Sequence, residues 1–208
     1  MKIVVIGASG RTGLQVLKHL DGSRHEVTAF VRNPAKLPNL NLRLAIVAGD
    51  VRDAAAMEKA VLGQDAVIAT IGANTFKIDD TQESFMRNLV RAMNKEGIKR
   101  VVNLSAMAAG DSLEGTAFFM RRIMMPFLLH NTYDDKNKGE VYLFNSDLDY
   151  INVRPGRLND GPAVGGVKAA LTYSGLNDRT MSREDLAIFM IAQLERQEWV
   201  RKSVLIGH

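Results

Sequence analysis

The chain has 208 residues, of which 46% are hydrophobic and 24% charged, a composition typical of one globular domain that buries a proper core. It contains no cysteine, which excludes a disulfide framework, a thiolate nucleophile and sulfur ligands to a metal, and which agrees with a reducing interior. No apolar stretch approaches the roughly 20 residues that span a bilayer, and no signal-peptide pattern opens the chain, so we expect a cytoplasmic protein without a membrane partner. The net charge of +4 is not clustered, so we expect no nucleic-acid partner.

Short β-branched runs alternate with amphipathic segments along the chain. The runs predict strands at residues 3–6, 27–31, 44–47, 66–71, 101–104 and 150–153. Helices are predicted at residues 12–20, 54–62, 82–95 and about 135–145, and Ser182-x-x-Asp185 resembles a capping box that opens a last helix through Glu195. Several strands are apolar throughout, as in a parallel sheet covered by helices on both faces. The predicted fold is therefore α/β, a Rossmann-type doubly wound parallel sheet in a single domain, residues 1–208.

A glycine-rich turn, IVVIGASGRTG at residues 3–13, follows the first predicted strand. Gly7 permits the tight turn, Gly10 lets the backbone approach a pyrophosphate, and Gly13 lets the next helix pack closely on the sheet. The N-terminus of that helix offers unpaired N–H groups and a partial positive charge to an anion. Because the turn joins a strand to a helix in a βαβ unit, it indicates a dinucleotide site; a turn that serves only packing is the alternative. The candidate binding residues in it are Gly7, Ser9, Gly10, Arg11, Thr12 and Gly13.

The end of the second predicted strand distinguishes NADP(H) from NAD(H). NAD-binding enzymes usually carry an acidic residue about 20 residues after the turn, where it holds the ribose hydroxyls. Here the sequence reads AFVRNPAKL, and no Asp or Glu lies between Glu26 and Asp50. Arg32 and Lys36 are suited to pair with a 2′-phosphate, with assistance from Arg11. The pattern predicts that NADP(H) is preferred over NAD(H), and a basic surface loop without a ligand is the alternative.

With these motifs placed, the chain resembles the atypical short-chain dehydrogenase/reductase family, in particular the NAD(P)H-binding proteins similar to biliverdin-IXβ reductase/flavin reductase within the NmrA-like superfamily. The likeness covers nearly the whole chain. It is carried by the stretches GASGRTG, VTAFVRNPAKLP, GDVRDAAAMEKAVLGQDAVIATIG, VVNLSA, YDDKNK, LDYINVRPGRLNDGP and TMSREDLAIFM.

The resemblance implies a position along the cofactor for further residues. Asp50 and Val51 are expected to contact the adenine, Ile71 and Gly72 to lie along the adenosine side, and Ser105 to face the nicotinamide. The segments around Lys136 and around Pro155 and Arg157 are expected to line the reactive end. Most of these residues follow a predicted strand, and ligands of open α/β sheets bind beyond the carboxyl ends of the strands. Each also has a structural alternative: Asp50 could cap a helix, Gly72 could form a turn, Ser105 could satisfy local backbone, and Pro155 could simply break a loop.

Typical members of the wider superfamily use a Tyr-x-x-x-Lys pair for proton transfer. Alignment on LDYINVRP places Lys136 at the lysine position and Thr132 at the tyrosine position. Tyr133 is one residue out of register, a rotation of about 100° on a helix. Ser105 and Lys136 are therefore the candidate catalytic residues, and hydride transfer to a flat conjugated acceptor would take its proton from water. Arg157 stands where pigment-reducing relatives carry a histidine, so we expect it to hold an anionic group of the substrate or cofactor.

The expected function is NAD(P)H-dependent reduction of a small molecule such as a flavin, a quinone or a similar flat conjugated acceptor. One alternative is a non-catalytic regulator that senses NADP(H), as NmrA-like proteins do. Another is a sugar-nucleotide epimerase or dehydratase, although such enzymes generally need the tyrosine and a longer C-terminal domain. The four histidines lack metal-ligand spacing, so no metal is expected.

A helical, apolar insert is expected at about residues 110–131, where the stretch TAFFMRRIMMPFLLHN covers 116–131. It lies between the two candidate catalytic residues. One interpretation is a helix packed on the core. The others are a mobile Met- and Phe-rich wall over an aromatic substrate, and a contact surface for a second subunit in a homodimer.

Overall fold

The computed structural model describes residues 1–39, 44–72, 80–106, 130–172, 176 and 180–208, and of residues 130–134 it describes the backbone alone. The strands are β1 (Lys2–Ile6), β2 (Glu26–Val31), β3 (Leu44–Ala48), β4 (Ala66–Ala69), β5 (Arg100–Leu104), β6 (Asp149–Pro155), β7 (Arg157–Asn159), β8 (Lys168–Ala170), β9 (Thr180–Ser182) and β10 (Lys202–Gly207). The helices are α1 (Arg11–Leu20), α2 (Ala54–Val61), α3 (Thr81–Glu96), α4 (His130–Phe144) and α5 (Arg183–Ala192), with a short 3-10 helix η1 (Pro34–Lys36).

The main sheet has the strand order β3-β2-β1-β4-β5-β6-β10-β8, and β7 pairs with β9 in a separate small sheet. Its strands run parallel except β8, which is antiparallel to β10. The chain runs outward from β1 to β3 and then returns to β4 on the other side of β1, so the order reverses between β1 and β4. A doubly wound sheet binds its ligand beyond the carboxyl ends of the strands at such a point. The predicted fold class is confirmed.

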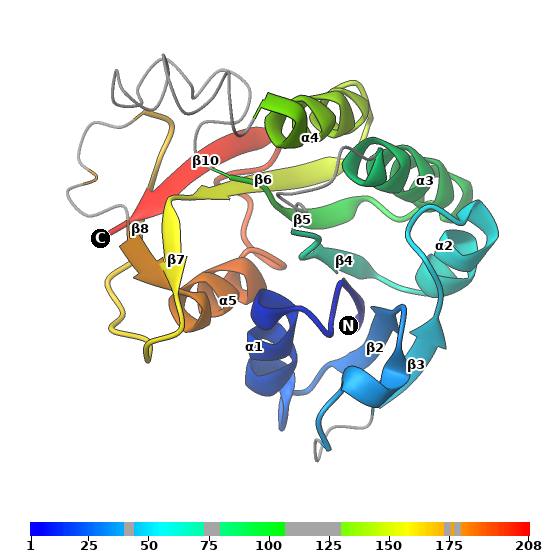
Figure 1. Cartoon of the computed structure of the whole chain (residues 1–208), viewed down its shortest axis with the longest axis horizontal. Helices are drawn as coiled ribbons and strands as arrows, with labels where there is room; N and C mark the ends of the chain where they lie inside the picture. The colour runs from blue at the N-terminus through cyan, green and yellow to red at the C-terminus, as the bar shows by residue number, and fades with distance from the viewer. Residues whose placement is uncertain (40–43, 73–79, 107–129, 173–175, 177–179) are drawn as a thin grey trace.

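Helices cover both faces of the sheet (Figure 1). On one face, α1 and α5 pack against each other and against a core cluster built from β1, β2, β5, β6 and β10. On the other face lie α2, α3 and α4, with a second cluster that includes the other faces of β1 and β4. Because both faces are covered, β1, β4 and β5 are buried at almost every position, which explains their unbroken apolar runs.

Local sequence signals set the ends of several helices. The side chain of Asp53 accepts hydrogen bonds from the N–H groups of Ala55 and Ala56 and so caps α2. Gly97 ends α3 with a φ of +73°, the left-handed conformation that glycine adopts readily. At the start of α5 the Ser182 hydroxyl accepts from the N–H of Asp185 at 2.9 Å, which confirms the predicted cap.

Some boundaries differ from the prediction. The helix expected from residue 135 begins at His130, the last helix ends at Ala192, and β4 ends two residues before Ile71. Strands β7, β8, β9 and β10 were not predicted. The expected apolar stretch 116–131 lies outside the described residues up to 129, and its last two residues begin α4. Within the described part of the chain, no helix is long and apolar enough to cross a membrane.

Candidate functional site

The glycine-rich turn lies at the carboxyl end of β1 and contacts the end of β4. Gly7 has a φ of +79° and donates its N–H to Phe30 O at 3.2 Å. A Cβ on Gly7 would lie 2.9 Å from Ile71 Cδ1, and one on Gly13 would lie 2.3 Å from Gly7 O. Gly13 is therefore needed for the close packing of α1 on the turn that follows β1. At Gly10 a Cβ would lie 3.1 Å from the same oxygen.

The N-terminus of α1 points its polar groups at this turn. Its N-cap residue is Gly10, which offers no side-chain cap, and the first turn carries no acidic residue. Ser9 is half-buried, Thr12 is buried and Arg11 is exposed. The first N–H groups and the positive end of the helix dipole are therefore available to an anion such as a pyrophosphate.

The Thr70 side chain, which the sequence analysis missed, fixes the end of β4 against the turn. Its hydroxyl donates to Ile6 O at 2.9 Å and reaches Gly7 O at 3.2 Å. Nearby, α3 holds two of the expected adenosine segments by their backbone: Gln82 Nε2 donates to Ile71 O at 3.2 Å and Asn88 Nδ2 to Val51 O at 3.1 Å. These contacts fix the backbone of the segments at Val51 and Ile71 at one edge of the sheet.

Gly72 is exposed, and an added Cβ there would meet no described atom within 4 Å. At the end of β6 the side chain of Pro155 is buried, and the next short strand, β7, begins with the exposed Arg157.

Basic side chains gather beyond β2 and β3. Arg32 and Lys36 are both exposed. Asp50 forms a two-point ion pair with Arg52, with Arg52 Nε 3.0 Å from Asp50 Oδ1 and Nη2 3.1 Å from Oδ2. The hydrogen bonds from Arg52 lower the pKa of Asp50, and the charge of Arg32 lowers it further. Arg32 thus lies close to Asp50, whereas Asp53 and not Asp50 caps α2.

A buried polar cluster lies where β5 and β6 meet α4. Its centre is Glu140, which is 2% exposed. Glu140 Oε1 accepts hydrogen bonds from the Ser105 hydroxyl and from Asn152 Nδ2, the latter at 2.8 Å. Its Oε2 accepts from Arg154 Nη2 at 2.8 Å in an ion pair whose side chains are both 3% exposed. The ion pair and the hydrogen bonds to Glu140 together satisfy a carboxylate and a guanidinium group, each of which would be costly to bury alone.

The cluster continues across the sheet in a row of aligned positions. Asn103 on β5 and Ser203 on β10 are both register partners of Asn152 on β6. Asn103 Nδ2 donates to Asn152 Oδ1 at 2.8 Å, and Asn152 Nδ2 lies 3.1 Å from Ser203 Oγ. The sequence analysis missed Glu140 and this row. Two features of the sequence could have indicated them: a polar residue inside each of three apolar strands, and the i, i+4 spacing of Lys136 and Glu140.

Lys136 lies one helical turn before Glu140 on α4 and is 7% exposed. Burial lowers the pKa of its amine to about 8, although the charges of Glu140 and Asp135 act in the opposite direction. Among the described residues, no hydrogen bond or ion pair within 4.0 Å satisfies this amine. An ammonium group on a buried side chain, without a partner among the described residues, is suited to donate hydrogen bonds to a ligand.

Contacts with α3 fix α4 in this place. Asp135 accepts hydrogen bonds from the N–H groups of Gln82 and Glu83 at 2.9 and 3.0 Å, and so caps α3 from the neighbouring helix. A Cβ on Gly139 would lie 2.8 Å from Gln82 O, so only glycine permits this approach. Two faces of α4 are therefore distinct: Asp135 and Gly139 hold it on α3, while Lys136 and Glu140 face the strands.

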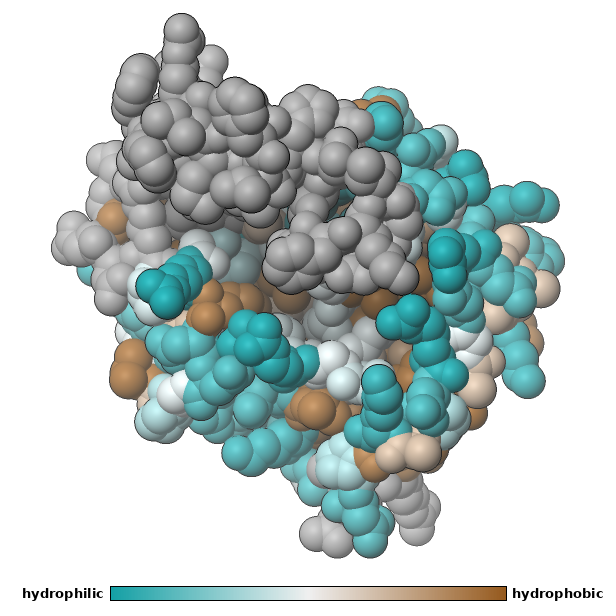
Figure 2. Space-filling model, in the orientation of Figure 1, coloured by the Kyte–Doolittle hydropathy of each residue, from teal (hydrophilic) through white to brown (hydrophobic). Residues whose placement is uncertain are grey.

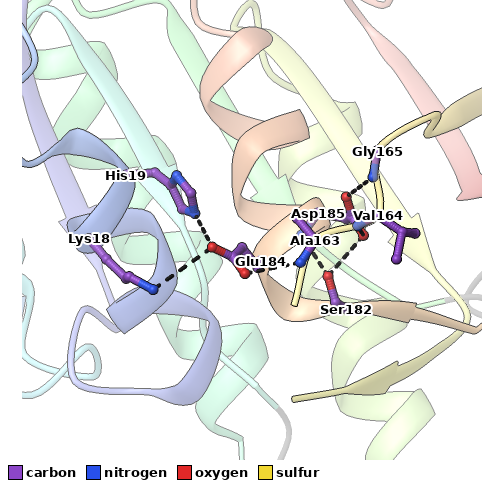
Figure 3. A network of polar contacts seen from close by, with 8 residues as sticks. All are labelled: Lys18, His19, Ala163, Val164, Gly165, Ser182, Glu184 and Asp185. Carbon is purple, nitrogen blue, oxygen red and sulfur yellow. Dashed lines mark hydrogen bonds and ion pairs between the residues drawn. The ribbon is translucent and has the colours of Figure 1, made fainter. Parts of the chain in front are cut away.

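The segment after β7 is anchored to the first turn of α5 (Figure 3). Glu184 accepts from Ala163 N at 3.0 Å and lies 3.0 Å from His19 Nε2, and Asp185 accepts from Val164 N and Gly165 N at 3.1 and 3.0 Å. Burial by itself would raise the pKa of Asp185, but these backbone donors and the Ser182 hydroxyl outweigh it, so the pKa is lowered.

Asp160 joins this segment to the glycine turn. Its carboxylate lies 3.4 Å from Arg11 Nη1 and 2.7 Å from Arg183 Nη1. The structure therefore places Arg11 beside the turn but paired with Asp160. Arg157, at the start of β7, is exposed and has Thr180 as its register partner.

Figure 2 shows one face of the molecule, in the orientation of Figure 1. In the space-filling view its centre is pale to brown, from neutral and apolar residues, with hydrophilic residues around it (Figure 2). Within the described residues, no group of three His, Asp or Glu side chains is placed to hold a metal ion. The arrangement thus combines a helix N-terminus without a side-chain cap, basic groups beyond β2 and a buried lysine beyond β5 and β6.

Comparison with known proteins gives a consistent result. A family model described as NAD(P)H-binding matches residues 7–197. The chain is 29% identical to a Bacillus subtilis protein called uncharacterized sugar epimerase YhfK, over 95% of this chain and 89% of that protein.

Two solved structures share the fold over the whole chain. One is a short-chain dehydrogenase/reductase from Veillonella parvula in complex with NADP, with a TM-score of 0.83, 19% identity and 94% of that chain covered. The other is ChuY, described as an anaerobillin reductase from Escherichia coli O157:H7, with a TM-score of 0.81, 20% identity and 97% of that chain covered. At these identities the likeness shows the fold.

Proposed function

Because the chain belongs to the NAD(P)H-binding family, as its resemblance to atypical short-chain dehydrogenases/reductases implied, we propose that it is an NADPH-dependent reductase of flat conjugated acceptors such as flavins or quinones. The observation that carries the proposal is the buried amine of Lys136 at the carboxyl edge of the sheet. A protein that bound a dinucleotide by its turn and basic loop alone would need no such costly group at the far end of the site.

The described residues fit a dinucleotide on two counts. The uncapped start of α1 offers N–H groups to the pyrophosphate, and a Cβ at Gly13 would close the turn that forms this cradle. In the proposed arrangement the adenosine end lies along the segments of Asp50, Val51, Ile71 and Gly72, and Arg32 and Lys36 bind the 2′-phosphate. The nicotinamide end lies toward Ser105 and Lys136, with Pro155 and Arg157 beside it.

The nicotinamide supplies the hydride, and the protein supplies position and charge. Lys136 donates hydrogen bonds to the bound group from a site that excludes water on most sides. With a pKa near 8, its amine is mostly protonated at neutral pH and increasingly neutral above it. Thr132 stands where the superfamily tyrosine is expected, so we infer that water, and not a tyrosine, provides the proton to the reduced acceptor.

The test is consumption of NADPH, followed by its absorbance, with FMN, riboflavin, quinones and biliverdin as acceptors. We expect turnover with at least one acceptor, and a Lys136→Met variant should lose most of it. Lys59→Met, which removes an exposed lysine on α2, is the matched control and should retain the activity. Tight NADPH binding without turnover of any acceptor would contradict the reductase proposal.

A second candidate function is an NADP(H) sensor without turnover, which the threonine at position 132 favours. The same assay separates the two, since a sensor binds the cofactor and leaves every acceptor unreduced. The epimerase name of the Bacillus subtilis relative points to a third chemistry, but Thr132 stands where such enzymes generally need a tyrosine.

The preference for NADP(H) rests on Arg32 and Lys36. Two charge-assisted contacts of roughly 1.5–3 kcal/mol each would exceed the about 1.4 kcal/mol that corresponds to a tenfold ratio. We therefore expect NADPH to bind at least tenfold more tightly than NADH, and Arg32→Ala to reduce that ratio. Arg24→Ala, which removes an exposed arginine paired with Glu195, is the control. Equal affinities for the two cofactors, measured by titration, would show that Arg32 and Lys36 do not bind the 2′-phosphate.

A further inference from the structure

The Ser105 hydroxyl has its hydrogen committed to a buried carboxylate. Its Oγ donates to Glu140 Oε1, and its backbone N–H donates to Val153 O at 2.7 Å. A serine hydroxyl has one hydrogen and two acceptor lone pairs. Once the hydrogen is used, the hydroxyl has only lone pairs to offer to a bound group.

The partners of Glu140 determine the direction of that hydrogen bond. Arg154 Nη2 and Asn152 Nδ2 are both donors, so the two carboxylate oxygens act as acceptors toward them. If Glu140 took up a proton to donate toward Ser105, the buried Arg154 charge would lose its counter-charge, which is strongly unfavourable. Glu140 therefore accepts from Ser105 and does not donate to it.

Lys136 stands in the same cluster with the opposite character. Its ammonium group has donors and no acceptor, while Ser105 offers acceptor lone pairs. Each side of the cluster thus recognises a different kind of group. An amide, which carries an N–H donor and a C=O acceptor together, is complementary to such a pair.

We propose that Glu140 is a positioning residue that makes Ser105 an obligate hydrogen-bond acceptor, and that Ser105 thereby binds the N–H of the nicotinamide carboxamide. The inference rests on the proposed function, because it requires the nicotinamide to lie at this end of the site. It assigns Ser105 to cofactor recognition and excludes it as the proton donor to the substrate. The role of Glu140 is to act through Ser105, without contacting the cofactor.

A cofactor analogue tests this directly by binding alone. The 3-acetylpyridine analogue of NADP replaces the carboxamide NH₂ with a methyl group and keeps the carbonyl. We expect the wild-type protein to bind NADP about fivefold to tenfold more tightly than the analogue, the ratio that one hydrogen bond of about 1–1.4 kcal/mol supplies. Ser105→Ala should remove the difference and leave the Glu140–Arg154 ion pair in place.

Glu140→Gln provides the decisive arm. The Gln amide is able to donate to Ser105 Oγ and so release the serine hydrogen, which would turn Ser105 from an acceptor into a donor. The preference for NADP over the analogue should then vanish or reverse, although both dinucleotides still bind. A residue that only stabilises the fold would weaken both by the same factor. Glu58→Gln, at an exposed ion pair with Lys95, is the control and should keep the wild-type ratio.

The outcomes separate this inference from the function on which it rests. Failure of the wild-type protein to bind either dinucleotide overturns both. Binding of both with equal affinity, or a preference that survives in Ser105→Ala, overturns the role of Ser105 and Glu140 and leaves the proposed reductase standing. If Glu140→Gln does not fold, as thermal denaturation would reveal, Glu140→Asp takes its place, because it keeps the charge beside Arg154 and withdraws the acceptor from Ser105. The preference for NADP over the analogue should then fall, and an unchanged preference would overturn the role of Glu140.

Discussion

Replacement of Lys136 by methionine should stabilise the protein while it impairs cofactor binding. Burial lowers the pKa of this lysine from 10.5 to about 8. At about 1.36 kcal/mol per pH unit, that shift means that the protonated lysine destabilises the folded state by about 3 kcal/mol below pH 8. Methionine has a similar unbranched shape and no charge. Its introduction does not orphan Glu140, which keeps Ser105, Asn152 and Arg154.

The expected gain depends on pH in a way that identifies its cause. Between pH 8 and about 10.5 the unfolded state binds more protons at this lysine than the folded state, so the wild-type protein becomes more stable as the pH rises. The advantage of Lys136→Met should therefore be largest at neutral pH and shrink toward pH 10.5.

Thermal denaturation of the two proteins at pH 7 and near pH 10 measures this. For a chain of this length 1 kcal/mol corresponds to about 2–4 °C, so Tm should rise by up to about 10 °C at pH 7. NADPH affinity should fall in the same variant, the trade-off common at functional sites. Lys59→Met, an exposed control, should stay within about 0.5 kcal/mol of the wild type. A lower Tm at pH 7, or a gain that does not change with pH, would refute the reasoning.

Two further substitutions test the turn and the α5 anchor. Gly13→Ala should lower stability by about 1–3 kcal/mol and NADPH affinity by more than tenfold, because its Cβ would lie 2.3 Å from Gly7 O. Gly22→Ala is the control: its Cβ meets nothing within 4 Å, so it should cost only about 1 kcal/mol of left-handed strain and leave NADPH binding intact. Asp185→Asn should lower the urea midpoint at pH 7 by the equivalent of about 2–3 kcal/mol, since it weakens hydrogen bonds from Val164 and Gly165. The pKa of Asp185 in the folded protein lies below its unfolded value of about 4, so this stabilisation is present at neutral pH and is lost as pH falls through the folded pKa. The difference in unfolding free energy between wild type and variant should therefore narrow near pH 3. A difference that does not change with pH would show that the charge is not involved.

The sequence predicted the sheet well wherever strands are buried on both faces. Strands β1, β2, β5 and β6 match the predicted apolar runs to within one or two residues, because burial on both sides requires apolar residues at every position. Strands β7, β8 and β9 are three residues each and pair only with segments distant in the chain. A run of three residues is too short to show the alternating hydrophobic pattern of a strand, and its pairing is decided by tertiary contacts. The longer β10 does carry a local signal, the apolar run Val204–Ile206.

The glycine turn was predictable because its chemistry is local. A strand, three spaced glycines and a helix are adjacent in the sequence, and the structure assembles them as a unit. The polar cluster could not be found in this way. Asn103, Asn152 and Ser203 each look like a single polar interruption of a strand, and they form a row only because of the register of β5, β6 and β10. Register depends on how the whole sheet packs.

Glu140 was missed for a related reason. In a helix that also carries Lys138 and an exposed Val141, a glutamate reads as a solvent-exposed residue. Its burial follows from Gly139, which lets α4 approach α3 so closely that the neighbouring face of α4 meets the strands. Gly139 therefore helps to place the carboxylate of the next residue, Glu140, in the site and not at the surface.

Within the described residues, two positively polarised groups differ from the helix ends and buried charges that the protein pairs internally. The first N–H groups of α2, α3 and α5 are bound by Asp53, by Asp135 from α4 and by Ser182. By contrast α1 has no side-chain cap, and the buried amine of Lys136 has no hydrogen-bonding partner among the described residues. Both groups carry positive charge or its partial equivalent, and both lie at the carboxyl edge of the sheet. These two groups are suited to hold a ligand, and a ligand that reaches from one to the other must be extended and anionic near α1, as a dinucleotide is.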